Sequence, residues 1–307
     1  MTKIAVLLLG FGGPDCMDDV APFVSNVAGR EMPAERLAGS IEKYRVIGGK
    51  SPLRETSQAQ ADLLQERLRK QIPDLRVYLG MRYWHPLTSE TIDNILNEDP
   101  ECIVLMSLSP YFSDITTGEY IRVAVREIKE RRPETPVLKI EAWNEEPDLI
   151  EGFARMLEKA MEDAPSGTPV VFTAHSLPQT AIDNGDPYED QVRSTASKAA
   201  DVAGLKDWTL GWQSEGHGRG RWLQPNTDEV LENIKADGGR GALMMPIGFT
   251  ADHMETLYDI DVVMRDKARQ IGLEFYRADC LNADDDVAKA MAGAVLRILG
   301  DERMMSQ

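Results

Sequence analysis

The stretch TPVVFTAHSLP, residues 168–178, is a run of apolar and β-branched residues that ends at His175 and is stopped by Pro178. Its apolar side chains follow one another without the polar alternation of a half-exposed strand. Continuous apolar strands are typical of a parallel sheet that is covered on both faces. The run therefore predicts a buried parallel strand with a histidine at its carboxyl end.

Runs of the same kind recur along the chain, and amphipathic helical patterns separate them. The predicted strands span residues 4–9, 75–81, 102–108, 137–143, 168–174, 208–212, 241–247 and 273–278. This alternation predicts an α/β fold with doubly wound, Rossmann-like sheets. Because the strands divide equally between the halves of the chain, we expect two similar domains, each with a four-stranded parallel sheet flanked by helices.

The boundary between the halves is expected within MEDAPSGTP (161–169), where a helical pattern gives way to Pro-Ser-Gly. This predicts an N-terminal Rossmann-like domain over 1–164 and a C-terminal one over 165–307, whose last helix can pack back on the first domain. SLSPYFSD (107–114) and MMPIGFTAD (244–252) echo each other, since both run from a strand through Pro, an aromatic and a hydroxyl residue to Asp. Two related halves predict a cleft between them, with the chemistry at the carboxyl ends of the strands.

Composition limits the class of ligand. A chain of 307 residues with 42% hydrophobic and 28% charged residues is an ordinary globular protein with room for two cores. Its net charge of −17 argues against nucleic acid or an anionic membrane as partner, because phosphate binding needs clustered Lys and Arg. The sequence has no apolar stretch of about 20 residues and no signal-like amino terminus, so we expect a cytoplasmic protein.

The cysteines do not indicate a metal or disulfide site. Cys16, Cys102 and Cys280 are odd in number, widely separated, and form no C-x-x-C pair. That pattern disfavours both a disulfide framework and a thiolate zinc or iron–sulfur site. The Gly-rich turns likewise follow neither nucleotide-binding fingerprint.

His175 has two open interpretations: a core histidine with both nitrogens satisfied, or a functional group at a strand end. A hydrolase with Ser176 as nucleophile is disfavoured, because AHSLP lacks the G-x-S-x-G elbow. Asp252, Glu255 and Asp259 are expected at i, i+3 and i+7 of a helix that begins around Thr250, which places the carboxylates on one face. Such a stripe is either a solvated face or, in this apolar neighbourhood, a path for a cation or a proton.

Lys43, Tyr44, Lys50 and Ser51 gather hydrogen-bond donors at one turn of an acidic protein. The cluster is either an exposed loop or a site for a ligand that bears carboxylates. The sequence alone leaves these two interpretations open.

Several segments together resemble the ferrochelatases, the enzymes that insert Fe²⁺ into a porphyrin. In chain order the segments are KYRVIGGKSPL, GMRYWHP, SLSPYFSDITTGEY, FTAHSLP, GWQSEG and PIGFTADHMETLYDID, within residues 4 to 280. GWQSEG and PIGFTADHMETLYD most resemble the soluble Gram-positive type, whose substrate is coproporphyrin III rather than protoporphyrin IX. The short C-terminus without cysteine resembles the forms that lack an iron–sulfur cluster.

The resemblance implies His175 and Glu255 as a facing pair of catalytic and iron-binding residues, with Asp259 continuing the metal-binding line. The porphyrin-binding residues that it implies are Phe11, Arg30, Lys43, Tyr44, Ser51 and Tyr120. Lys43 stands where a related arginine would, and Arg30 is the nearest candidate for a second one. Phe11 replaces a tyrosine that can reach the metal axially in the Gram-positive type. We expect the rings of Phe11, Tyr111 and Trp222 to hold the macrocycle.

The implied function is that of a lyase of haem biosynthesis, a ferrochelatase that prefers coproporphyrin III. It would need no cofactor, because Fe²⁺ is a substrate, and its partners would be porphyrin and ferrous iron, bound by a monomer. Protoporphyrin IX as substrate and cobalt insertion into another tetrapyrrole remain the enzymatic alternatives. The non-enzymatic alternative is a tetrapyrrole or haem carrier, for which the acidic stripe beside His175 would be unnecessary.

Overall fold

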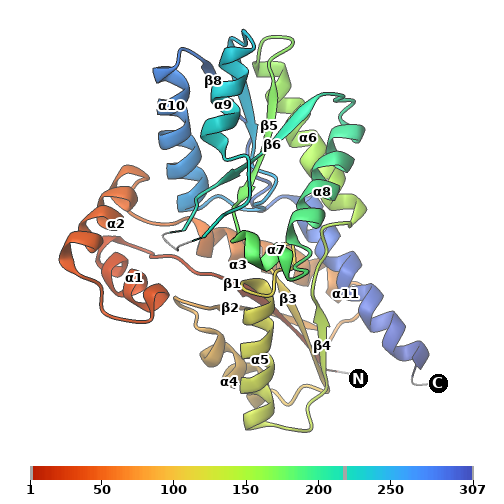
Figure 1. The fold of residues 1–307 in the computed structure, drawn as a ribbon. Coiled ribbons are helices and arrows are strands. Elements are labelled where there is room, and N and C mark those ends of the chain that lie inside the picture. The colour runs from red at the N-terminus through yellow and green to blue at the C-terminus, as the bar shows by residue number, and fades with distance from the viewer. Residues whose placement is uncertain (1–2, 217–219, 306–307) are drawn as a thin grey trace.

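Two four-stranded parallel sheets, one above the other in Figure 1, form the framework of the protein. The computed structural model describes residues 3–216 and 220–305. The first sheet has the order β2-β1-β3-β4, with β1 (Ile4–Gly10), β2 (Arg76–Met81), β3 (Cys102–Ser107) and β4 (Val137–Ile140). The second has the order β6-β5-β7-β8, with β5 (Val170–His175), β6 (Trp208–Gln213), β7 (Gly241–Met245) and β8 (Glu274–Arg277). The predicted fold class and the position of every predicted strand are confirmed.

The central strands are buried along their whole length, which is why their sequences are continuously apolar. All residues of β1, β3 and β7 are buried, and in β5 only the terminal His175 is partly exposed. Every pair of neighbouring strands is parallel. Helices therefore have to cover both faces of each sheet.

The helices surround the sheets and also tie them together. They are α3 (Leu53–Arg69), α4 (Thr88–Asn97), α5 (Thr117–Arg131), α6 (Pro147–Asp163), α7 (Gln179–Asp183), α8 (Tyr188–Val202), α9 (Thr227–Ala236), α10 (Arg265–Gln270) and α11 (Asp285–Met305). Helix α6 packs against α8 and α11, and α11 packs against both α6 and α3 of the first half. The domain boundary at residue 165 stays a prediction, but helices on either side of it link the two sheets.

One apolar core runs through both halves. Its largest cluster joins Val6 and Val104 of the first sheet to Phe172 and Leu243 of the second, with Met291 of α11 between the helices. Burial of this apolar surface stabilises the relative position of the two sheets. Among residues 3–216 and 220–305, none of the helices combines the length and the apolar character needed to span a bilayer.

The two sheets have equivalent strand orders, so the site is expected at the same position in each sheet. In each sheet the order reverses beside the first strand, β1 or β5, and ligands of open α/β sheets bind at such a reversal. The two echoing segments, 107–114 and 244–252, follow β3 and β7, which hold equivalent places in their sheets. The loops after β1, β3, β5 and β7 are therefore where the site is expected.

An arm between β1 and α3 was not predicted from the sequence. It contains the 3₁₀ turn η1 (Met17–Asp19), α1 (Val20–Ala28) and α2 (Ala34–Val46), and it projects to one side in Figure 1. Phe23 and Tyr44 form its small core and pack against Trp84. Residues of the arm line one side of the cleft described below.

The helix after β7 differs from the prediction. Residues Glu255–Met264 form a π-helix, η2, which continues into α10. It begins after Asp252, so the predicted α-helical stripe of Asp252, Glu255 and Asp259 is wrong in its first member. π-helices are rare, are mostly limited to a single turn, and occur often at functional sites.

Candidate active site

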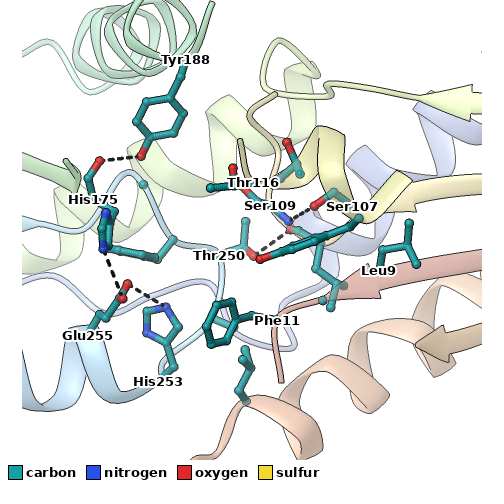
Figure 2. Close-up of a pocket in the computed structure, with 18 of the residues that line it drawn as sticks. Leu9, Phe11, Ser107, Ser109, Thr116, His175, Tyr188, Thr250, His253 and Glu255 are labelled. Atoms are coloured by element: carbon teal, nitrogen blue, oxygen red, sulfur yellow. Dashed lines mark hydrogen bonds and ion pairs between the residues drawn. The ribbon is translucent and has the colours of Figure 1, made fainter. Parts of the chain in front are cut away.

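A cavity of about 430 Å³ lies where the carboxyl ends of both sheets meet (Figure 2). Its wall includes residues 9–11 after β1, 107–109 after β3, 175–178 after β5 and 248–251 after β7. This volume falls in the range of small-molecule sites, which are mostly apolar with a few convergent polar groups. The ionisable side chains in its wall include His175, His253 and Glu255.

A second cavity of about 380 Å³ lies under the arm and adjoins the first. Phe11, Leu53, His253 and Glu255 line both, so the two cavities are compartments of one cleft. The second compartment also receives Lys43, Tyr44 and Ser51, which come from α2 and the turn after it. A flat ligand that fills both compartments passes directly beside Phe11 and Glu255.

His175 ends β5 with its ring turned into the cleft. Its Nδ1 lies 2.6 Å from the carbonyl oxygen of Ser176, and Tyr188 donates its hydroxyl proton to the His175 carbonyl at 3.0 Å. Because a carbonyl only accepts, Nδ1 carries a proton and Nε2 is the nitrogen that titrates. Nε2 is also the atom that faces Glu255, at 3.4 Å from its Oε1.

Gly248 allows the segment that carries Glu255 to pass close to the end of β5, where His175 lies. The Gly248 N–H donates to the carbonyl of Thr173 at 3.0 Å, so the segment after β7 crosses the end of β5. A Cβ atom on Gly248 would lie only 2.7 Å from Cα and Cβ of Ala174. The close crossing therefore needs glycine, and it leads the chain directly to the start of η2.

Glu255 stands between two histidines, as Figure 2 shows. Its Oε2 lies 3.7 Å from Nε2 of His253, and its backbone carbonyl accepts a hydrogen bond from the Gln213 side chain at 2.9 Å. The ring of His253 packs edge-on against Phe249, and its Nδ1 is buried with no hydrogen-bond partner in the described part of the chain. Sequence reasoning did not single out His253, although its place two residues before Glu255 in ADHME could have suggested it.

The pair of His175 and Glu255 is held in its charged form. Burial alone would lower the pKa of His175, but the Glu255 carboxylate raises it to about 9. Burial would likewise raise the pKa of Glu255, and the facing His175 lowers it instead. At neutral pH the pair is an imidazolium and a carboxylate with no net charge, so a metal cation has to displace a proton to bind Nε2.

Asp259 lies on η2 beyond Glu255 and is held by the loop after β6. The Ser214 hydroxyl donates to Asp259 Oδ2 at 2.5 Å, and Ser214 itself has a left-handed φ of 59°. Backbone conformations of this kind persist where the surroundings enforce them, often at active sites. Among the residues that the structure describes, no three His, Cys, Asp or Glu side chains converge into a closed metal site. The charge of Asp259 still reaches the pair, because it helps to raise the pKa of His175.

Two expected site residues point elsewhere. Asp252 lies outside the predicted acidic line, because it forms an ion pair with Arg277 at 3.2 Å and accepts a hydrogen bond from Thr256 at 2.9 Å. Tyr111 is fully buried, and its hydroxyl donates to the Ile247 carbonyl at 2.7 Å. It joins the two halves beneath the cleft and does not line the cavity, whereas Trp222 does.

The predicted porphyrin-binding residues fall into two groups. Phe11, with 41% of its surface exposed, separates the compartments, while Tyr120 lines the first and Tyr44 and Ser51 the second. The Lys43 ammonium lies 5.2 Å from the centre of the Tyr258 ring, on η2 across the cleft. Arg30, in contrast, is exposed at the end of α1 and lines neither compartment.

Comparison with known proteins gives a consistent result. The profile of the family described as ferrochelatase matches residues 3–299. A ferrochelatase of Herpetosiphon aurantiacus is 34% identical over 288 residues, which cover 92% of this chain and 94% of the relative. One from Geotalea uraniireducens is 34% identical over 320 residues, covering 98% and 99%. These descriptions name no particular porphyrin.

Solved structures share the fold at low sequence identity. SirB from Bacillus subtilis, determined with Fe³⁺, aligns with a TM-score of 0.64 at 11% identity and covers 98% of both chains. CbiX, described as the terminal enzyme of sirohaem biosynthesis in denitrifying bacteria, aligns with a TM-score of 0.55 at 13% identity, covering 96% of this chain and 98% of its own. At this level of identity the likeness concerns the fold alone.

Proposed function

The chain belongs to the ferrochelatase family, and from this we propose that His175 and Glu255 form the centre at which it inserts Fe²⁺ into a porphyrin. As a member of the family it is a lyase that inserts metal into porphyrin in haem biosynthesis. The observation that carries the proposal is the 3.4 Å contact between His175 Nε2 and Glu255 Oε1 inside a largely apolar cleft. There His175 and Glu255 can bind the metal ion and accept the protons that it replaces in the porphyrin.

The proton balance fits this pair. Insertion releases both pyrrole protons as Fe²⁺ takes their place in the ring. Because His175 is protonated at neutral pH, Nε2 first has to release its proton to water. The neutral imidazole then accepts one pyrrole proton, and the Glu255 carboxylate takes the other only transiently and passes it on. His253 at 3.7 Å from Glu255 offers the next acceptor, through which the protons leave toward water. The hydrogen bond from Nδ1 to Ser176 keeps Nε2 directed at the porphyrin throughout.

The metal path is proposed to run along η2. Imidazole and carboxylate ligands both suit Fe²⁺, and selectivity among divalent metals comes from geometry and supply. Asp259, held by Ser214, provides a carboxylate between the loop after β6 and Glu255. An incomplete ligand set favours transfer, because a metal held by few protein ligands is released to the macrocycle instead of being retained.

Coproporphyrin III is proposed as the preferred porphyrin. It carries a carboxylate side chain on every pyrrole ring, whereas protoporphyrin IX has vinyl groups on some. Support comes from donors in both compartments: the Lys43 ammonium and Tyr44 hydroxyl in the second, and the Tyr120 hydroxyl in the first. Carboxylates at both ends of the ligand would find partners, and charge-assisted hydrogen bonds of this type are strong.

An anaerobic absorbance assay tests the proposal. Purified protein is given coproporphyrin III or protoporphyrin IX with Fe²⁺, Zn²⁺ or Co²⁺, and the loss of free-base bands is followed. We expect iron insertion with the higher kcat/KM for coproporphyrin III, and its loss in His175→Ala with porphyrin binding retained. His85→Ala is the matched control, since His85 is exposed, pairs with Glu90 and lines neither compartment. Near-normal turnover in a folded His175→Ala variant would contradict the assigned role.

A further inference from the structure

The far side of η2 is clamped by an arginine that the proposed reaction does not use. Arg277, the last residue of β8, places Nε 2.9 Å from Asp261 Oδ1 and Nη1 3.2 Å from Asp252 Oδ1. Its side chain is only 11% exposed. A planar guanidinium presents its donors in a rigid fork, so it fixes the geometry of two carboxylate partners more tightly than a flexible ammonium does. The arginine thus links a residue before η2 to a residue within it.

Asp252 is also fixed by its other neighbours. Asn282 donates its side-chain amide to Asp252 Oδ2 at 2.9 Å and accepts the Asp252 N–H at 2.8 Å. The carbonyl of Asn282 in turn accepts from Gln60, a buried residue of α3 in the first half. Both halves of the molecule therefore hold the segment that enters η2.

Glu255 lies between the two clamped positions, three residues after Asp252 and six before Asp261. A π-helix turns through a smaller angle per residue than an α-helix, so a change to α geometry would rotate Glu255 relative to Asp261. Because π turns are rare, this one needs contacts from outside the helix to persist. Gln213 and Ser214 hold it from the cleft side, and Arg277 holds it from behind.

We propose that Arg277 is a positioning residue: by tying Asp252 to Asp261 it keeps η2 in the form that presents Glu255 to His175. The effect on turnover rests on the proposed function, but the contact between His175 and Glu255 can be followed without any substrate. The proposal accounts for the burial of an ion-paired arginine behind the site. A buried pair is costly to desolvate and is weak evidence for stability alone, so its value here lies in orientation.

Arg277→Lys is the first test, because it keeps the charge but loses the rigid planar fork that fixes the geometry of both pairs. We expect kcat to fall about 10²-fold, the effect of a misplaced catalytic group, with the KM for porphyrin changed by less than about 2-fold. In the substrate-free protein, the ring ¹⁵N signals of His175 should move toward those of Glu255→Gln. Arg265→Lys is the matched control, since Arg265 forms its ion pair with Asp261 alone, at 3.3 Å, among the described residues and is more exposed.

If Arg277→Lys does not fold, the double variant Arg277→Gln/Asp252→Asn removes both charges and leaves Asp261 its pair with Arg265. The same shift of the His175 signals is expected. A folded variant whose His175 signals match the wild type overturns the proposal, whatever its activity. An equal shift in Arg265→Lys does so too. Loss of insertion in every protein, wild type included, would overturn the proposed function, while the signals would still decide the role of Arg277.

Discussion

The Nε2 atom of His175 and the Oε1 atom of Glu255 lie 3.4 Å apart, one at the end of β5 and the other at the start of η2. Burial lowers the pKa of His175, but the Glu255 carboxylate raises it to about 9, above its ordinary value of about 6.5. Because metal and pyrrole protons both need a neutral Nε2, we expect kcat/KM to rise with pH from about 6.5 to 9. Steady-state rates across this range, with Zn²⁺ as metal, give the midpoint.

Glu255→Gln should move that midpoint to lower pH. Burial lowers the pKa of His175, and without the Glu255 carboxylate only the weaker effects of the Ser176 hydrogen bond and the Asp259 charge oppose it. The variant should also lose at least about 10²-fold in turnover if Glu255 accepts a proton. An unchanged midpoint would show that another group controls the profile.

The same pair should make stability depend on pH. Folding raises the pKa of His175, so its contribution is full below about 6.5, the ordinary histidine pKa, and is lost as pH rises through about 9. Folding lowers the pKa of Glu255, so its contribution is present above about 4.3 and is lost as pH falls through about 2. The Tm difference between wild type and His175→Gln should therefore be largest between about pH 4.5 and 6.5. A difference that stays constant from pH 4 to 10 would refute the linkage.

The strands could be predicted from sequence because their burial on both faces leaves a local signal. β1 and β5 are apolar at nearly every position, and the residue that breaks the pattern, His175, marks the site. The arm could not be predicted in this way. Its helix α1 is short, contains Pro22, and is stabilised by Phe23 packing against Tyr44 and Trp84, which are distant in sequence.

The π-helical form of η2 also could not be predicted from the sequence. Spacings of three and four residues fit an α-helix, and this expectation placed Asp252 beside Glu255. The π-helix instead depends on contacts from Gln213, Ser214 and Arg277, which no local periodicity reveals. Tertiary contacts override local preference here, as is common at functional sites.

Gly248→Ala should destabilise the fold and impair the site together. The new methyl group would meet Ala174 at 2.7 Å, and overpacking of this kind costs about 1–3 kcal/mol. Relief of the clash would push the segment before Glu255 away from β5. Gly39→Ala is the control, because a Cβ there meets nothing within 4 Å, and alanine in a helix interior gains about 0.5–1 kcal/mol over glycine. Urea unfolding and turnover of both variants check this; equal stabilities would disprove the tight crossing.

Asp259→Asn should affect the metal more than the chemistry. The hydrogen bond that holds Asp259 comes from Ser214, which can still hydrogen-bond an amide at this position. We expect the KM for Fe²⁺ to rise severalfold with a smaller loss in kcat than in Glu255→Gln. Asp266→Asn on α10 is the control, since Asp266 is exposed and, within the described part of the chain, forms an ion pair only with the exposed Arg269. A kcat loss equal to that of Glu255→Gln would assign Asp259 to proton transfer instead.

Phe11→Tyr examines the wall that separates the compartments. The ring centres of Phe11 and Tyr83 lie 4.8 Å apart, and Phe11 is 41% exposed and lines the cleft together with His253 and Glu255. A porphyrin that fills both compartments would therefore place one face against this ring. Once the ferrous product has been oxidised by air, the added hydroxyl should bring an oxygen ligand to the ferric iron on the face opposite His175, because ferric iron prefers an anionic oxygen to an empty position. The absorption spectrum of the bound product should shift and its release should slow, while Tm changes by little, since an exposed hydroxyl costs almost no desolvation.

Stopped-flow transfer of the product to a haem acceptor measures the release. If spectrum and release rate both match the wild type, Phe11 does not lie over the metal, and the macrocycle occupies only one of the two compartments.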